Sequence, residues 1–241
     1  MTYSEVSRRT RINRSALREW ARNRDLVDKY EGPGDCVRCH PLPGLPHPEG
    51  AYSYLLGLYL GDGYISYVGD RKKRVWAMRI ACADAWPGLI SECVDALKSL
   101  RPGHPVHVTN RIGCKDVSAQ WKHWPCYFPQ HGPGRKHTRR IELAPWQDDI
   151  THRHPRSLLR GLFHSDGCRF TNPVRRKIAG EWRHYEYPRY FFTNESQDIL
   201  GICTRHLDQL GIEWKMTRRN NVSVAQRASV ALLDEFIGPK Y

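Results

Sequence analysis

The sequence lacks long apolar runs and is short of acidic residues. No segment approaches the roughly 20 consecutive apolar residues that a membrane-spanning helix needs, and the arginine-rich start has no apolar stretch typical of a secretory signal. We therefore expect a cytoplasmic protein without a membrane partner. The 25 Asp and Glu residues face 38 Lys and Arg residues, a net charge of +13, which favours a polyanionic partner such as nucleic acid.

Disulfides are not expected, because the eight cysteines belong to a chain without a secretory signal. Six of them are scattered in mostly apolar surroundings and are expected to be small core residues. These are Cys82, Cys93, Cys114, Cys126, Cys168 and Cys203.

Cys36 and Cys39 lie in a Gly- and Pro-rich linker and have the spacing of half a zinc site. His40 or His47 would supply a third ligand, and Cys126, His131 and His137 could complete such a site across the fold. The alternative, which we favour, is a pair of free thiols without structural Zn²⁺.

A nine-residue stretch occurs twice. LLGLYLGDG at residues 55–63 returns 104 residues later as LRGLFHSDG, with five of nine positions identical. Gly57 and Gly61 are four residues apart and share a helix face, as do Gly161 and Ser165. Small residues on such faces predict two helices whose backbones pack closely. Each closing glycine is expected just past its helix end, in a left-handed conformation.

Asp62 and Asp166 therefore fall at two helix C-termini, where the helix dipole repels a carboxylate by about 0.3–1 kcal/mol. Two such carboxylates side by side require a cation. With the backbone carbonyls of Gly61 and Ser165 they would form an all-oxygen site suited to hard ions such as Mg²⁺ or Mn²⁺. The alternative is that each Asp-Gly is only a turn signal.

The two stretches resemble the paired motifs of single-chain LAGLIDADG homing endonucleases, and the resemblance covers residues 51–241. It implies two αββαββα halves, motif helices crossing at the centre, and two sheets that grip duplex DNA. It also implies that Asp62 and Asp166 bind the divalent ions that drive phosphodiester cleavage. The chain differs at the sixth motif position, where the family often has Asp and this sequence has Leu60 and His164. The same scaffold occurs in regulators that do not cut, including a bacterial sporulation regulator.

The expected fold is thus α+β, with two pseudo-symmetric halves at residues 51–145 and 146–241 after a linker at 29–50. Alternating residues predict strands at 64–68, 75–81, 105–110, 115–121, 168–177, 184–194, 213–217 and 221–226. Helical periodicity predicts helices at 86–100, 196–210 and 229–237. Residues 1–28 resemble the last two helices of a bacterial helix-turn-helix module, whose second helix enters the major groove.

Metal-assisted cleavage usually adds a cation that stabilises developing charge. Lys122 and Arg227 lie 60 and 61 residues beyond their aspartates and are the candidates, although each could equally be a surface cation. His164 could reach the site or merely pack, and we favour packing.

The expected partner is double-stranded DNA, bound by a monomer with internal two-fold pseudosymmetry. Basic loops would contact phosphates and strand residues would read bases in the major groove. The candidate DNA contacts are Asn13, Arg14, Ser15, Arg18, Arg22, Arg71, Lys72, Lys73, Arg74, Arg79, Arg169, Arg175, Arg176, Lys177, Arg189, Lys215, Arg218 and Arg219. Two hypotheses remain: a magnesium-dependent endonuclease, favoured by the retained aspartates, and a non-cleaving transcriptional regulator, favoured by the helix-turn-helix-like segment.

Overall fold

The computed structural model describes residues 2, 4–5, 44–69, 75–132, 134–178, 180–238 and 240, and divides the chain into units of residues 1–44 and 45–241. Residues 6–28 of the helix-turn-helix-like segment, the Cys-x-x-Cys pair and the first basic tip fall outside the described residues. The candidate residues concerned are Asn13, Arg14, Ser15, Arg18, Arg22, Cys36, Cys39, His40, Arg71, Lys72, Lys73 and Arg74.

The first half of the second unit consists of a helix and a hairpin followed by another helix and hairpin. Its elements are α4 (Glu49–Gly61), β1 (Gly63–Tyr67), β2 (Trp76–Ala83), α5 (Pro87–Leu100), β3 (Val106–Arg111) and β4 (Cys114–Trp121). The strands form one antiparallel sheet in the order β1-β2-β4-β3. Met78 and Ile80 of β2 point into the core, while Arg79 between them faces the other side, as the strand alternation predicts.

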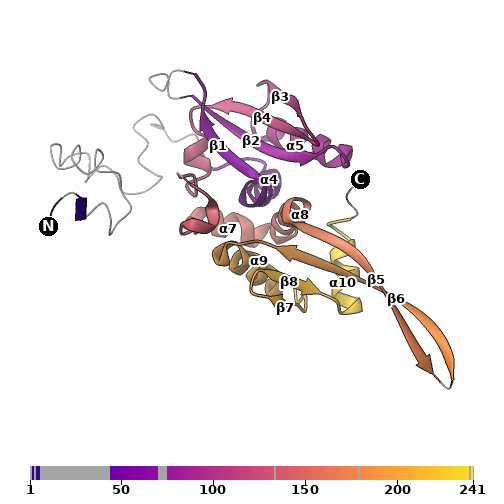
Figure 1. Ribbon diagram of the computed structural model, residues 1–241. Coiled ribbons are helices and arrows are strands. Elements are labelled where there is room, and N and C mark those ends of the chain that lie inside the picture. The colour runs from indigo at the N-terminus through magenta and orange to yellow at the C-terminus, as the bar shows by residue number, and fades with distance from the viewer. Residues whose placement is uncertain are drawn as a thin grey trace. The chain divides into compact units, whose positions relative to one another are not determined.

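The second half repeats this order. Its elements are α8 (Pro155–Asp166), β5 (Gly167–Ile178), β6 (Glu181–Thr193), α9 (Gln197–Gln209), β7 (Lys215–Arg218), β8 (Asn221–Val224) and α10 (Arg227–Asp234). The sheet order β5-β6-β8-β7 matches that of the first half. Ser196 caps α9 as predicted, because its Oγ accepts a hydrogen bond of 3.4 Å from the Ile199 amide. The expected α+β fold of two αββαββα halves is confirmed (Figure 1).

Short helices occupy the segment between the two sheets. They are α6 (Trp124–Tyr127), η3 (Lys136–Thr138) and α7 (Pro145–Arg153). A proline in the first turn starts both α6 and α7. The Trp124 indole, fully buried, donates a 2.8 Å hydrogen bond to the Ala119 carbonyl and so ties α6 to the first sheet.

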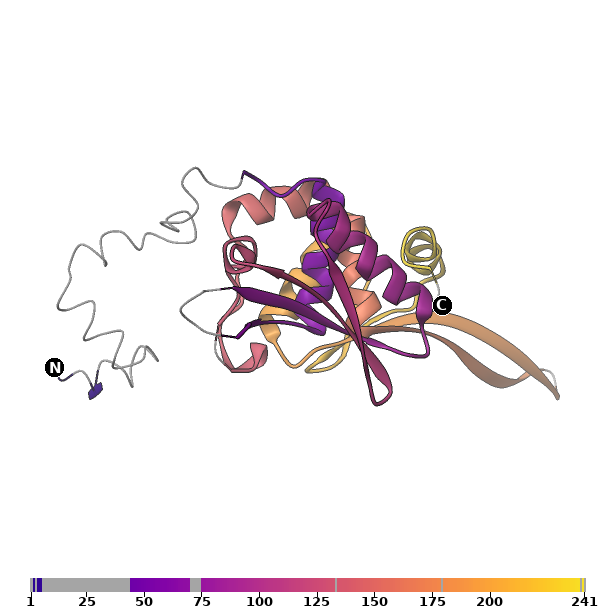
Figure 2. The same ribbon diagram turned by 90° about the horizontal axis from the view of Figure 1, so that it is seen from above.

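The motif helices α4 and α8 cross at the centre, with one sheet on either side of the pair (Figures 1 and 2). They approach so closely that side chains are excluded at the crossing. A methyl group placed on Gly161 would lie 2.1 Å from the Tyr54 carbonyl oxygen, and one on Gly57 would lie 2.5 Å from the Leu158 carbonyl oxygen. The repeated small residues therefore act as predicted.

The glycine that ends each motif does not take the predicted left-handed conformation. Gly167 has φ −101° and ψ 163°, which is extended backbone, and Gly63 is absent from the glycines with positive φ. Space is the reason for glycine here. A Cβ on Gly63 would lie 2.5 Å from the Tyr59 Cα, and one on Gly167 would lie 2.7 Å from the Phe163 Cα.

The cysteine prediction holds in part. Cys82, Cys93 and Cys203 are buried core residues, Cys114 and Cys126 are partly exposed, and Cys168 is exposed on β5.

Within the described residues, every helix is too short or too polar to cross a lipid bilayer.

The hairpin of β5 and β6 is much longer than its counterpart. Its two strands pair from Gly167 with Phe192 to Ile178 with Glu181, but β8 continues the sheet only along 190–193 of β6. Beyond that point two strands project alone from the body of the molecule, as the orange ribbon in Figure 1 shows. Arg175 and Trp182 lie near the tip, with the guanidinium carbon 4.9 Å from the ring centre.

Candidate functional site

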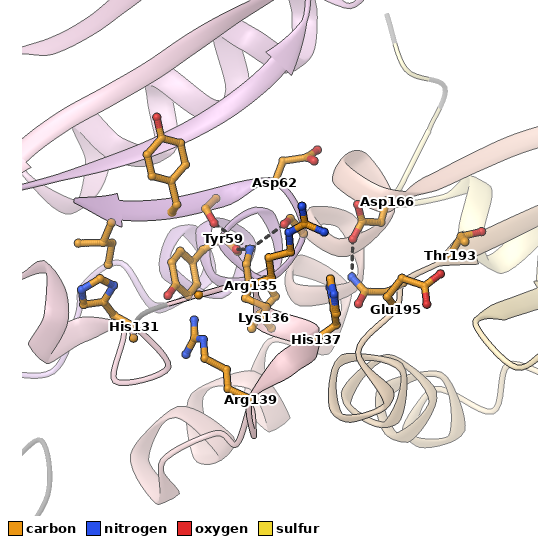
Figure 3. Close-up of a pocket in the computed structure, with 18 residues that line it drawn as sticks. Tyr59, Asp62, His131, Arg135, Lys136, His137, Arg139, Asp166, Thr193 and Glu195 are labelled. Carbon is orange, nitrogen blue, oxygen red and sulfur yellow. Dashed lines mark hydrogen bonds between the residues drawn. The ribbon is translucent and has the colours of Figure 1, made fainter. Parts of the chain in front are cut away.

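The two motif aspartates meet at one cavity. Asp62 directly follows α4 and Asp166 is the last residue of α8, so the crossing of these helices brings both carboxyls to the same place. The cavity has a volume of about 500 Å³ and is also lined by the segment around Lys136 and by residues 193–195 (Figure 3). The sequence predicted both aspartates and their juxtaposition.

Both carboxyls are held in surroundings that disfavour their charged form. Partial burial and then the negative charge of Asp166 raise the pKa of Asp62 to about 6, against the opposing effect of Lys136 and Lys240. Burial also raises the pKa of Asp166, whose carboxylate accepts a 2.6 Å hydrogen bond from the Asn194 amide. Among the described residues, no hydrogen bond joins the Asp62 side chain to a partner. The two carboxyls are therefore not equivalent.

Lys136 caps the end of α4. Its ammonium donates to the carbonyls of Tyr59, Gly61 and Gly63 at 2.5, 2.7 and 2.8 Å, which uses its three N–H groups (Figure 3). Burial lowers the pKa of Lys136 to about 8, although the two aspartates oppose this shift. A cation thus compensates the negative end of the helix dipole beside Asp62.

Lys240 takes the corresponding place at the end of α8. It donates a 3.3 Å hydrogen bond to the Ser165 carbonyl, and burial lowers its pKa while Asp62 and Asp166 raise it. Each lysine lies 74 residues after its aspartate. Each also follows, by two residues, a glycine with positive φ: Gly134 at 79° and Gly238 at 68°. A left-handed turn therefore delivers each lysine.

Lys122 and Arg227 are not the cations that the structure brings to the two aspartates. Lys122 directly follows β4 and Arg227 starts α10, and both are exposed and outside the cavity lining. Their spacings of 60 and 61 residues differ by one, whereas the Asp-to-Lys spacing of 74 is identical in both halves. That identity, together with the repeated glycine, was the signal in the sequence for Lys136 and Lys240. Asn194 carries no comparable signal.

The residues at the cavity fit a hard divalent ion. Two carboxylates at one cavity, whose raised pKa values show that their negative charge is only partly offset, are oxygen donors of the kind that Mg²⁺ and Mn²⁺ prefer. The Gly61 and Ser165 carbonyls, named as further ligands, each accept a lysine hydrogen bond and keep one lone pair. In the described part of the chain no three His, Cys, Asp or Glu side chains cluster to hold a metal. An ion here would take its remaining ligands from water or a bound phosphate.

The zinc ligands proposed to complete the Cys36 and Cys39 pair do not come together. Cys126 lies in α6, where its Sγ is 3.9 Å from the His123 Nδ1. His131 and His137 instead line the cavity of the two aspartates.

The predicted DNA contacts divide into two groups. Arg169 is bound by Asp234 of α10 through bonds of 2.8 and 3.0 Å, and Arg219 pairs with Glu195 at 3.0 Å. The remaining described candidates take part in none of the ion pairs of the described residues. They are Arg79, Arg175, Arg176, Lys177, Arg189, Lys215 and Arg218. Two of them, Arg79 and Arg189, carry a buried guanidinium nitrogen without a hydrogen-bond partner.

His164 packs inside the molecule. Its side chain is buried between Tyr54 and the backbone of Ile237 and does not line the cavity. The preference for packing over a place in the site agrees with this position.

Comparison with known proteins finds likeness only among solved structures. No protein-family model matches the sequence, and no curated protein matches it. Mesophilic variants of the homing endonuclease I-DmoI are 16% identical over 78% of this chain and 90% of theirs, with a TM-score of 0.49. I-DmoI in complex with DNA and Mn is 15% identical over 80% of this chain and 98% of its own, with a TM-score of 0.48. The N-terminal LAGLIDADG domain of WhiA is 15% identical over 82% and 87%, with a TM-score of 0.47. Over most of its length, the chain is similar to LAGLIDADG homing endonucleases and to the LAGLIDADG domain of WhiA.

Proposed function

We propose that this chain binds double-stranded DNA and hydrolyses phosphodiester bonds with the help of divalent ions. One observation carries the proposal: the two aspartates of a repeated motif share one cavity, and a lysine at the same spacing of 74 residues serves each helix end. If each Asp-Gly were only a turn signal, the two aspartates would not need to share a cavity, and no lysine would be needed at each helix end.

The side chains divide the chemistry between them. Asp62 and Asp166 would hold the ions. A bound cation would lower the pKa of the Asp62 carboxyl from about 6, because it stabilises the deprotonated form that acts as the ligand. A divalent ion held by these two residues would supply the Lewis acidity that activates a water and offsets charge on the leaving oxygen. Lys136 and Lys240 keep positive charge beside the scissile phosphate, where negative charge develops.

The long hairpin supports DNA as the partner. Two strands without a core behind them are marginally stable in water, so a bound partner would stabilise them. The major groove of B-DNA admits a two-stranded ribbon. Arginines with no carboxylate partner among the described residues, such as Arg175, Arg176 and Arg189, suit both phosphates and guanine edges.

A second candidate is a DNA-binding regulator that does not cut. The three N–H groups of Lys136 already donate hydrogen bonds to backbone carbonyls, and the Asn194 amide donates one to the Asp166 carboxylate. These contacts stabilise the helix ends without an ion. In this alternative the paired charges are structural, and the sheets bind DNA as they would in the enzyme.

A randomised duplex library separates the two candidates. The full chain is incubated with it in Mg²⁺ and, separately, in EDTA, and both bound and cut molecules are sequenced. Mg²⁺-dependent ends at a shared site would support the endonuclease, and enriched sites without ends would support the regulator. Binding should weaken steeply with salt in both cases, and an affinity that is independent of salt would argue against a phosphate-dominated interface.

Variants assign the roles. Asp62→Asn, Asp166→Asn and Lys136→Met should abolish cleavage while leaving DNA affinity nearly unchanged. Lys122→Met is the matched control, because it removes an exposed lysine outside the cavity. Asp62→Asn that cuts at the wild-type rate would overturn the assignment of the metal ligands.

A further inference from the structure

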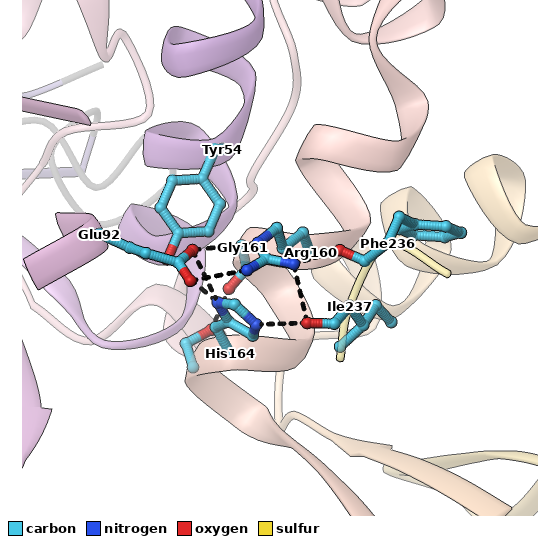
Figure 4. Close-up of polar contacts among 8 residues, drawn as sticks. Tyr54, Glu92, Arg160, Gly161, His164, Phe236 and Ile237 are labelled. Carbon is cyan, nitrogen blue, oxygen red and sulfur yellow. Dashed lines mark hydrogen bonds and ion pairs between the residues drawn. The ribbon is translucent and has the colours of Figure 1, made fainter. Parts of the chain in front are cut away.

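The segment that carries Lys240 is held from one side by α8. The helix α10 ends at Asp234, and Glu235, Phe236 and Ile237 lead to the turn at Gly238 that delivers Lys240. Arg160 and His164 both reach the backbone of this segment (Figure 4). They are four residues apart on α8 and therefore share one face of the helix.

Both side chains bind backbone carbonyls. The Arg160 Nη1 donates to the carbonyls of Phe236 and Ile237, the latter at 2.9 Å, and the His164 Nε2 lies 3.0 Å from the same Ile237 oxygen. A carbonyl only accepts, so Nε2 carries the proton and donates it. The other nitrogen, Nδ1, then accepts from the Tyr54 hydroxyl at 3.0 Å. The Ile237 carbonyl oxygen thus accepts hydrogen bonds from both Arg160 and His164.

The first half of the molecule fixes these donors in turn. Glu92 of α5 accepts two hydrogen bonds from Arg160, at 2.6 and 3.0 Å, and so sets the plane of the guanidinium. Tyr54, which orients the His164 ring, belongs to α4. Residues of α4 and α5 therefore determine where a segment of the second half lies.

The motif itself does not require these polar residues. The corresponding positions of the first motif are Leu56 and Leu60, both buried. Lys136 of the first half needs no such anchor, because it binds three carbonyls at the end of α4 itself. Lys240 makes one longer hydrogen bond, of 3.3 Å, to Ser165. The polar pair thus occurs only in the half whose lysine has the weaker hold.

We propose that Arg160 and His164 are positioning residues: by holding the Ile237 carbonyl, they keep Lys240 at the end of α8 beside Asp62 and Asp166. The catalytic consequence rests on the proposed function, but the placement of Lys240 does not. The two can therefore be tested separately.

The placement is measured by acetylating the full-length folded protein at one fixed pH and following each lysine by mass spectrometry. The variants are His164→Leu and Arg160→Leu, which copy the first motif, and His164→Gln, which keeps a donor near Nε2. Losing the one hydrogen bond from His164 to Ile237 should speed modification of Lys240 about fivefold in His164→Leu, and losing two bonds to the segment should speed it at least as much in Arg160→Leu. Lys136 should be unchanged and is the internal reference. His164→Gln should restore slow modification.

Arg205→Leu is the control for loss of a charge, because Arg205 is half exposed on α9 and pairs only with Asp148 at 3.6 Å among the described ion pairs. Circular dichroism confirms that each variant is folded. If His164→Leu does not fold, Arg160→Leu and His164→Gln still decide the outcome. Unchanged modification of Lys240 in the folded leucine variants would overturn the proposal.

Cleavage supplies the second readout. In an active enzyme, the leucine variants should lower the single-turnover rate about fivefold at unchanged DNA affinity, and His164→Gln should recover it. Faster Lys240 modification in a protein that cuts no DNA would keep the positioning role and reject the proposed function. A reduced rate with unchanged Lys240 modification would reject the positioning role.

Discussion

The carboxyl of Asp62 lies at the end of a helix, where burial and Asp166 raise its pKa and Lys136 and Lys240 lower it. Its raised pKa means that ionisation in the folded state is unfavourable, so the charged form costs folding free energy. Removing that charge should stabilise the protein when no cation is present. The Asp62 carboxylate would therefore be retained for metal binding, although its charge lowers the stability of the fold.

We expect Asp62→Asn to raise the free energy of unfolding at pH 7.5 in EDTA by about 1–3 kcal/mol, because each unit by which burial and Asp166 raise the pKa corresponds to about 1.4 kcal/mol before screening by solvent reduces it. The gain depends on pH in a defined direction. Asp62 titrates near pH 6 when folded and near its ordinary, lower value when unfolded. The cost of its charge is therefore full above about pH 6, and the advantage of the variant should vanish below about pH 4.

Urea denaturation at pH 7.5 and pH 4 measures this difference, with Asp84→Asn, an exposed aspartate of the same half, as the control. Addition of Mg²⁺ should stabilise the wild type more than Asp62→Asn. An equal response of both proteins to Mg²⁺ would contradict Asp62 as a metal ligand.

At the scale of elements, the crossing of α4 and α8 places the site. The two helices touch backbone to backbone, so the positions of Asp62 and Asp166 follow from the rigid geometry of the crossing. Polar links from α5 through Arg160 add a second connection between the halves. A change at the crossing should therefore affect folding and site geometry together.

Gly161→Ala tests the crossing. The added methyl group would lie 2.1 Å from the Tyr54 carbonyl, which as backbone cannot move aside, and overpacking of this kind costs about 1–3 kcal/mol or more. Gly201→Ala is the matched control, since Gly201 lies within α9 with no atom within 4 Å of the added group. The control should gain about 0.5–1 kcal/mol. Urea midpoints compare the two, and equal midpoints would show that the helices are not tightly packed.

At the scale of the whole molecule, the two halves share one strand order but differ in the length of their first hairpin. The paired ends Gly63 and Ile80 enclose 18 residues, whereas Gly167 and Phe192 enclose 26. The second hairpin is therefore eight residues longer, and its ladder has twelve paired positions against five in the first. Every four residues of each strand span about 14 Å at about 3.4 Å per residue, close to four base pairs of DNA.

The bound DNA should accordingly be protected further on the side of the second half. Deleting residues 171–174 and 185–188 removes four residues from each strand and preserves the alternation of faces. Nuclease footprinting of this variant should show protection about four base pairs shorter on one side only. Symmetric shortening, or none, would mean that the hairpin does not lie along the DNA.

The sequence alone determined the architecture and the two aspartates, because both depend on local pattern and on a repeat. Small residues four apart specify a close helix crossing, alternating residues specify strands, and the 104-residue repeat specifies the pseudosymmetry. Tertiary structure alone decided the rest. The shared spacing of 74 residues and the repeated glycine mark Lys136 and Lys240 in the sequence, but only the packing of their turns shows that they reach the ends of α4 and α8. Arg169 is bound by Asp234 of a helix 65 residues away, and no local periodicity encodes such a pairing.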